Sequence, residues 1–89
     1  MKILLIEDNE EIANGLLYTF KENNYEFYHV NSLDKAKNII NKIDFNLIIL
    51  DVTLSDGNGF DFYKENLNLK NIPVIFLTAK DSEDDIVKG

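Results

Sequence analysis

Short apolar runs alternate with amphipathic stretches along the whole chain. The run Lys2–Glu7 (KILLIE) is continuous and apolar over its centre, which is typical of a strand buried on both faces of a sheet. Apolar residues then recur at helical spacing from Ile12 to Phe20, after Asn9 as a candidate N-cap. Gly15 weakens this helix, which suggests a close packing contact there. The beginning of the chain therefore predicts a strand followed by a helix.

The same alternation continues to the last apolar run. Tyr25–Val30 is aromatic and β-branched with polar interruptions, which favours a strand near the sheet edge. A second amphipathic helix follows Ser32, its candidate N-cap, and a third is expected over Phe60–Leu67. Phe45–Asp51 is the most hydrophobic run and is expected to be a central strand. Ile72–Thr78 predicts a fourth buried strand, with a proline near its start.

The resulting order, strand and helix in strict alternation with short loops, indicates the α/β class. We expect a doubly wound parallel sheet with right-handed crossovers and helices on both faces. No internal repeat or linker interrupts the pattern, so residues 1–89 are expected to form one domain. The final stretch DSEDDIVKG is typical of the first turns of another helix.

Composition narrows the class of protein. With 89 residues, 45% of them hydrophobic and 28% charged, the chain is expected to be one small soluble domain. It has no cysteine, which excludes disulfides and thiolate metal sites. The net charge of −7 and the scattered basic residues argue against direct nucleic-acid binding. No apolar run is long enough to span a membrane and no signal peptide is evident, so we expect a cytoplasmic protein without membrane contact.

Acidic side chains follow the predicted strands at the edge of the sheet where α/β proteins place their sites. Glu7 and Asp8 end the first strand, Asp51 ends the third, and Thr78 ends the fourth. Each has a structural alternative, since acidic residues often cap helices and Thr78 alone reads as a loop hydroxyl. Their joint occurrence favours a divalent cation, and an oxygen-only ligand set suits Mg²⁺. A carboxylate beside Mg²⁺ can attack a phosphoryl donor and form an acyl phosphate.

The segments ILLIEDNEEI, LIILDVTLSDGNGF and PVIFLTAKDSEDD resemble the receiver domain of two-component response regulators, and the resemblance covers the whole chain. It implies a flavodoxin-like sheet of order 2-1-3-4-5. It also implies a phosphoacceptor signalling domain rather than an enzyme, with a sensor histidine kinase as its partner. Such domains usually precede an output domain, which often binds DNA.

The resemblance assigns a role to each candidate site residue. Glu7 and Asp8 match the acidic pair that organises Mg²⁺, and Asp51 matches the phosphorylated aspartate. Thr53 matches the position whose backbone carbonyl coordinates the metal. Thr78 matches the switch hydroxyl that moves toward the phosphoryl group. Within the chain the departures are mild, chiefly Ser55 where the family usually has a proline.

A larger departure is that the family's fifth strand and last helix, with a lysine that pairs with the phosphoacceptor, have no counterpart in the sequence. The expected strand order is therefore 2-1-3-4. The run Ile72–Thr78 would then form an exposed apolar edge, for which we expect self-association or marginal stability. We also expect acyl-phosphate formation to be slower than in a full-length receiver.

Two other functions compete with phosphoryl acceptance. An aspartyl-nucleophile phosphatase usually carries a second aspartate two residues after the first, where this chain has Thr53. A phosphorylation-independent interaction module is compatible with the missing strand but leaves the acidic set unexplained. A calcium loop beginning at Asp51 fails, because its sixth position is Asp56 rather than glycine and its twelfth is Phe62 rather than glutamate.

Overall fold

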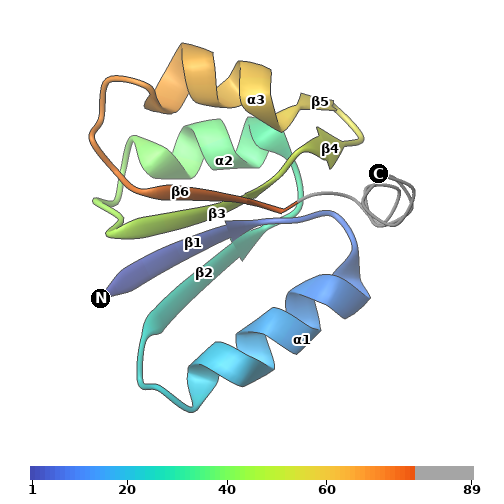
Figure 1. Ribbon diagram of the computed structural model, residues 1–89, viewed down its shortest axis with the longest axis vertical. Coiled ribbons are helices and arrows are strands. Elements are labelled where there is room, and N and C mark those ends of the chain that lie inside the picture. Colours follow the sequence, from blue (N-terminus) through green and yellow to red (C-terminus); the bar gives the residue numbers. More distant parts are fainter. Residues whose placement is uncertain (78–89) are drawn as a thin grey trace, which may run out of the picture.

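The computed structural model describes residues 1–77, whose centre is a four-stranded parallel sheet (Figure 1). Its strands are β1 (Lys2–Ile6), β2 (Glu26–Val30), β3 (Leu47–Asp51) and β6 (Val74–Leu77), in the order β2-β1-β3-β6. Since β6 is the fourth strand of this sheet along the chain, the predicted order 2-1-3-4 is confirmed. The polar-interrupted β2 lies at an edge and the hydrophobic β3 lies inside, as expected.

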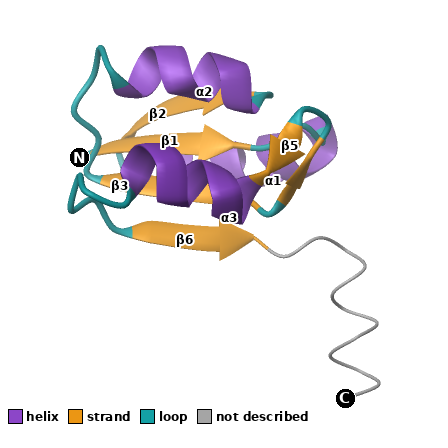
Figure 2. Cartoon of the chain, turned by 90° about the horizontal axis from the view of Figure 1, so that it is seen from above, coloured by secondary structure: helices purple, strands orange, loops and turns teal. Residues whose placement is uncertain are grey.

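Helices cover both faces of the sheet. Helix α1 (Glu10–Lys21) lies on one face, and α2 (Leu33–Ile40) and α3 (Gly59–Phe62) lie on the other (Figures 1 and 2). The π-helical turn η1 (Tyr63–Leu67) continues α3. None of the helices within residues 1–77 is long and apolar enough to cross a bilayer.

Side-chain caps begin the first two helices where the sequence predicts them. The Oδ1 atom of Asn9 accepts the N–H of Ile12 at 3.1 Å, and the Oγ atom of Ser32 accepts the N–H of Lys35 at 3.2 Å. The packing contact predicted at Gly15 is wrong. A Cβ atom built there would meet nothing within 4 Å, because this position of α1 is exposed.

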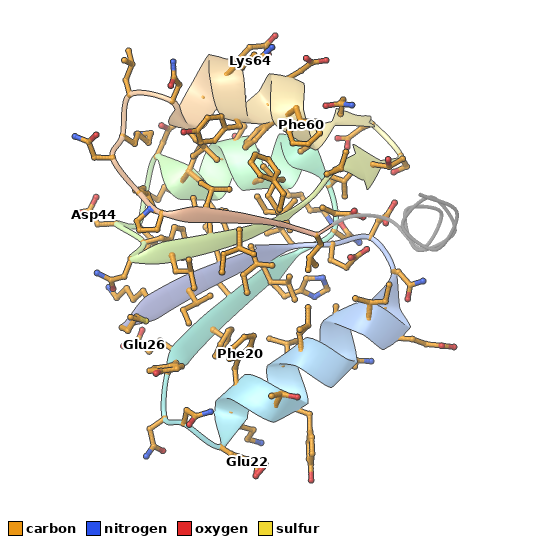
Figure 3. The ribbon with its side chains drawn as sticks, in the orientation of Figure 1. Phe20, Glu22, Glu26, Asp44, Phe60 and Lys64 are labelled. Atoms are coloured by element: carbon orange, nitrogen blue, oxygen red, sulfur yellow. The ribbon has the colours of Figure 1, made fainter. Side chains whose placement is uncertain are left out.

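The alternation of side chains along the strands divides the core into two clusters. Leu4, Ile6, Ile48 and Leu50 are buried on the side of α2 and α3. Ile3, Leu5 and Ile49 are buried with Ala13 on the side of α1. An aromatic pair extends each cluster. The ring centroids of Phe20 in α1 and Phe27 are 4.9 Å apart, and those of Phe60 in α3 and Phe76 are 4.6 Å apart. Figure 3 labels Phe20 and Phe60.

The connection between β3 and α3 contains a hairpin where the sequence predicted only a loop. Strands β4 (Thr53–Leu54) and β5 (Gly57–Asn58) pair antiparallel, with Ser55 and Asp56 at the turn. The turn residues are Ser55 and Asp56 rather than the Asn-Gly or Asp-Gly pair typical of two-residue hairpins, and each strand has only two residues, so the sequence pattern gives no hairpin signal here.

Strand β6 pairs with β3 and with no other strand in the part of the chain that the structure describes. Ile75 in its middle is 52% exposed. The expected apolar edge is thus present over Val74–Leu77, within the range described.

Candidate metal centre

Three carboxylates meet where β1 and β3 end. Glu7 and Asp8 follow β1 directly, and Asp51 is the last residue of β3, its neighbour in the sheet. One carboxylate oxygen from each residue lies within 4.8 Å of those from the other two. Adjacent parallel strands end at the same edge, so the topology itself gathers these residues from distant parts of the chain.

The cluster has a buried floor and an open rim. Glu7 is 3% exposed and Asp51 6% exposed, whereas Asp8 is exposed to solvent. Burial raises the pKa of the Glu7 carboxyl to about 7. The nearby charge of Asp51 and hydrogen bonding with the Asp51 and Asp8 carboxyls act in the same direction, while the N–H of Asn9 partly offsets them. The carboxyl groups therefore lie close enough together to disfavour full ionisation.

Hydrogen bonds to β2 and to Asn9 hold Glu7 in place. Its N–H donates to the carbonyl of Val30 at 3.1 Å, which extends the pairing of β1 with β2. Its carbonyl oxygen lies 2.8 Å from the Nε2 atom of His29. Its Oε2 atom accepts the N–H of Asn9 at 3.0 Å. Backbone and side chain of Glu7 are thus both constrained, and Oε1 has none of these contacts.

The backbone after Asp51 is fixed from two sides. The N–H of Val52 donates to the carbonyl of Leu77 at 3.1 Å, and the carbonyl of Val52 accepts the N–H of Gly59 at 2.6 Å. A Cβ atom at Gly59 would clash with the backbone carbonyl of Asp51, so only glycine fits there. The N–H of Thr53 lies 3.4 Å from the Oδ1 atom of Asp51, which orients that carboxylate.

This donor set fits a hard divalent cation. The ligand atoms on offer are carboxylate oxygens, and Mg²⁺ binds through a few carboxylates while retaining waters. Burial, and to a lesser extent the nearby charge of Asp51, raises the pKa of Glu7, and a bound divalent cation would offset both effects. Of the other predicted site residues, Thr53 lies on β4 beside the cluster, and Thr78 lies outside the described residues.

Sequence reasoning missed polar residues that shape the loops around the site. Asn58 caps α3, because its Oδ1 atom accepts the N–H groups of Phe60 at 2.8 Å and Asp61 at 3.2 Å. The Asp56 carboxylate accepts hydrogen bonds from the first N–H groups of α2, which are distant from it in the sequence. Asn58 could have been found from its position before a predicted helix, whereas the partner of Asp56 is visible only in three dimensions.

Comparison with known proteins agrees with this arrangement. The family model for the response regulator receiver domain matches residues 3–89. This chain belongs to the response regulator receiver domain family. This chain is 38% identical over 89 residues to the transcriptional regulatory protein HprR of Escherichia coli. The match covers 100% of this chain and 40% of HprR. Across three curated relatives, the matched part spans between 35% and 40% of their length.

Solved structures show the same fold. The non-phosphorylated HemR receiver domain from Leptospira biflexa superposes with a TM-score of 0.80 and 31% identity, covering 99% of this receiver domain and 72% of that chain. The MaeR response regulator bound to beryllium trifluoride superposes with a TM-score of 0.81 and 25% identity, covering 100% of this receiver domain and 79% of that chain. The flavodoxin-like fold predicted from the sequence is therefore confirmed.

Proposed function

We propose that this receiver domain accepts a phosphoryl group on Asp51 from a sensor histidine kinase, in a reaction that requires Mg²⁺. The observation that carries the proposal is the convergence of Glu7, Asp8 and Asp51, with one oxygen of each within 4.8 Å of the others. The proposed domain covers residues 1–89 and acts as a phosphoacceptor for signalling, not as an enzyme with a separate substrate.

In the proposed step, a carboxylate oxygen of Asp51 attacks the phosphorus of a phosphohistidine. A new O–P bond forms as the N–P bond breaks, and the electron pair of that bond returns to the imidazole nitrogen of the kinase. A bound Mg²⁺ supplies charge neutralisation for the phosphoryl oxygens. Glu7, Asp8, Asp51 and the backbone carbonyl of Thr53 would hold the ion.

The burial of Asp51 supports its role as the nucleophile. Asp51 is only 6% exposed, so most water is kept away from its carboxylate. Asp8 is exposed, so a phosphoryl donor can approach the cluster from the side of Asp8. The MaeR relative binds beryllium trifluoride, a compact anion similar in size to a phosphoryl group. An anion of that size approaching three carboxylates needs a cation, which favours joint binding of metal and phosphoryl group.

The remaining roles are proposed by analogy with the family and from the exposed surface of the described residues. We propose that Thr78 acts as the switch hydroxyl that responds to phosphorylation, and that the domain works in the cytoplasm. Ile75 is exposed on β6, whose outer edge pairs with no strand within residues 1–77, and we propose that this edge favours self-association. With a net charge of −7, the chain is not expected to bind nucleic acid itself.

The test is acyl-phosphate formation from a small phosphodonor such as acetyl phosphate, followed by intact-mass spectrometry with and without Mg²⁺. Phosphorylation is expected only with Mg²⁺ and only when Asp51 is present, so Asp51→Asn should abolish it. Asp61→Asn is a matched control, because Asp61 is an exposed carboxylate in the first turn of α3 outside the cluster.

Equal phosphorylation of Asp51→Asn and the unsubstituted chain would refute the assignment of Asp51. If the unsubstituted chain neither bound Mg²⁺ nor became phosphorylated, the alternative of a phosphorylation-independent interaction module would be favoured instead.

A further inference from the structure

A single carboxylate joins the β4–β5 hairpin to the beginning of α2. The Oδ1 atom of Asp56 accepts the N–H of Leu33 at 3.0 Å, and its Oδ2 atom accepts the N–H of Asp34 at 3.1 Å. The partners lie 23 and 22 residues apart in the sequence, so these are tertiary contacts. Because both oxygens are engaged, the side chain is fixed in orientation as well as position.

The beginning of α2 is suited to this carboxylate. The first N–H groups of a helix have no partner within the helix, and the helix dipole favours negative charge there. Ser32 accepts the N–H of Lys35, which leaves the N–H groups of Leu33 and Asp34 for Asp56. The N–H of Leu33 and then that of Asp34 hold the pKa of Asp56 below its ordinary value, so the carboxylate stays ionised at neutral pH.

Packing reinforces the same junction. A Cβ atom added to Gly57, the residue after Asp56, would lie 2.8 Å from the Cδ1 atom of Leu33. The hairpin therefore rests directly on the first residue of α2. Leu54, opposite Gly57 in the hairpin, is buried in the same core cluster as Leu33.

The other end of the hairpin reaches the carboxylate cluster. Thr53 pairs with Asn58 across the hairpin, and the N–H of Thr53 lies 3.4 Å from the Oδ1 atom of Asp51. Asn58 is followed by Gly59, whose N–H donates to Val52 beside Asp51. The β4–β5 hairpin thus links Asp51, the last residue of β3, to the beginning of α2 through a series of direct contacts.

We propose that Asp56 is a positioning residue that fixes the hairpin against α2 and thereby sets the geometry of the Thr53 carbonyl and the Asp51 carboxylate for Mg²⁺. The inference rests on the proposed function of these groups as metal ligands. Loss of a contact that orients a metal ligand directly typically weakens metal binding about 10-fold to 100-fold, and Asp56, which acts through the hairpin, is expected at the lower end of that range.

The coupling runs in both directions, because linkage between two sites is reciprocal. If Asp56 holds the site in its binding geometry, occupancy of the site must in turn hold Asp56 on α2. Mg²⁺ should therefore slow hydrogen exchange at the N–H groups of Leu33 and Asp34. The N–H of Lys35, bound by Ser32 instead, serves as the internal reference in the same helix.

The decisive experiment compares Asp56→Ala with Ser32→Ala in the full 89-residue chain. Both remove acceptors from the first turn of α2, but only Asp56 joins α2 to the hairpin. Both should lower the thermal unfolding midpoint. Measured by calorimetric titration with MgCl₂, Asp56→Ala should weaken binding by about 10-fold or more, whereas Ser32→Ala should change it by less than about 2-fold.

A milder variant covers the case in which Asp56→Ala does not fold. Asp56→Asn keeps one acceptor oxygen and should give an intermediate loss of Mg²⁺ affinity. Unchanged affinity in a folded Asp56 variant, with only the unfolding midpoint lowered, would overturn the proposal and leave Asp56 as a simple cap.

Hydrogen exchange without metal separates this inference from the proposed function. Faster exchange of the Thr53 and Gly59 amides in the Asp56 variants, but not in Ser32→Ala, would support positioning of the hairpin even if the unsubstituted chain bound no Mg²⁺. In that event the proposed function would fail, and the hairpin contact would remain. Equal exchange in all variants would overturn the positioning role itself.

Discussion

The two loops that supply the carboxylate cluster are held in different ways. The β1–α1 connection is short, and the Glu7 carboxylate is bound by its near neighbour Asn9, which also caps α1. Only the Glu7 backbone is bound by distant residues, Val30 and His29. The β3–α3 connection is longer and depends on distant groups: Val52 is bound by Leu77, and Asp56 by the beginning of α2. The Glu7 carboxylate is therefore positioned by a near neighbour, whereas the loop after Asp51 depends on the tertiary structure.

This difference bears on how each side responds to change. The contact between the Glu7 carboxylate and Asn9 can form again whenever α1 forms, since both residues adjoin that helix. A loop held by distant partners is sensitive to any shift of the elements that hold it. We expect perturbations elsewhere in the fold to alter the geometry of Asp51 and Thr53 more than that of Glu7.

The largest expected effect is on the tertiary side of the site, at Gly59. In Gly59→Ala the new Cβ atom would clash with the carbonyl of Asp51, and backbone atoms cannot move aside cheaply. We expect a loss of about 3 kcal/mol or more in the free energy of unfolding, at the upper end of overpacking costs. Urea denaturation measures it.

Gly15→Ala is the matched control for that substitution. It lies in the middle of α1 with nothing within 4 Å of the added atom, so it should stabilise the chain by about 1 kcal/mol. If Gly59→Ala proved as stable as Gly15→Ala, the backbone contact between Gly59 and Asp51 would not constrain the site.

The next effect concerns the local side and its charge. The folded-state pKa of Glu7 is raised from 4.5 to about 7, so between these values the folded chain retains a proton that the unfolded chain has lost. Without divalent ions, the Glu7 contribution to stability is full below pH 4.5 and is lost as the pH rises through about 7. The slope should reach at most about 1.4 kcal/mol per pH unit.

Chemical denaturation in EDTA across this pH range measures that slope, with Glu7→Gln as the comparison. The glutamine cannot ionise, so the free energy of unfolding of the variant should not decline as the pH rises through this range. A decline of the same size in Glu7→Gln would assign it to other groups and would contradict the raised pKa.

The smallest effect is expected from Asn9→Ala, which removes the cap of α1 while leaving the backbone N–H that binds Glu7. The loss should be about 1 kcal/mol, as for other caps. Its influence on hydrogen exchange should remain within α1 and spare Thr53 and Gly59. Spread of the effect to those amides would show that the two loops are coupled more closely than their contacts indicate.

The fold was predictable from sequence because its signals are local. Continuous apolar runs identified the strands, and Asn9 and Ser32 identified the starts of two helices. The convergence of Glu7, Asp8 and Asp51 was also accessible, since parallel strands place their ends at one edge. Strand ends combined with topology are thus enough to nominate the cluster.

The rest of the site depends on contacts between distant residues. Nothing in the sequence around Asp56 indicates that its partners are Leu33 and Asp34. Gly15 was expected to pack closely, but nothing lies within 4 Å of a Cβ atom built there. At Gly59, by contrast, a Cβ atom would clash with the backbone of Asp51. A glycine in a helix has several possible reasons, and only its surroundings distinguish them.

The two faces of the sheet carry unequal cores. Among the described residues, eleven are buried in the cluster beside α2 and α3 and four in the cluster beside α1. Native-state fluctuations begin where the fewest apolar contacts must break, so α1 should detach and reform more often than its counterparts. Glu7 and Asp8 lead straight into that helix through its cap. The acidic pair therefore adjoins the helix with the smaller buried core, whereas Asp51 adjoins the larger one.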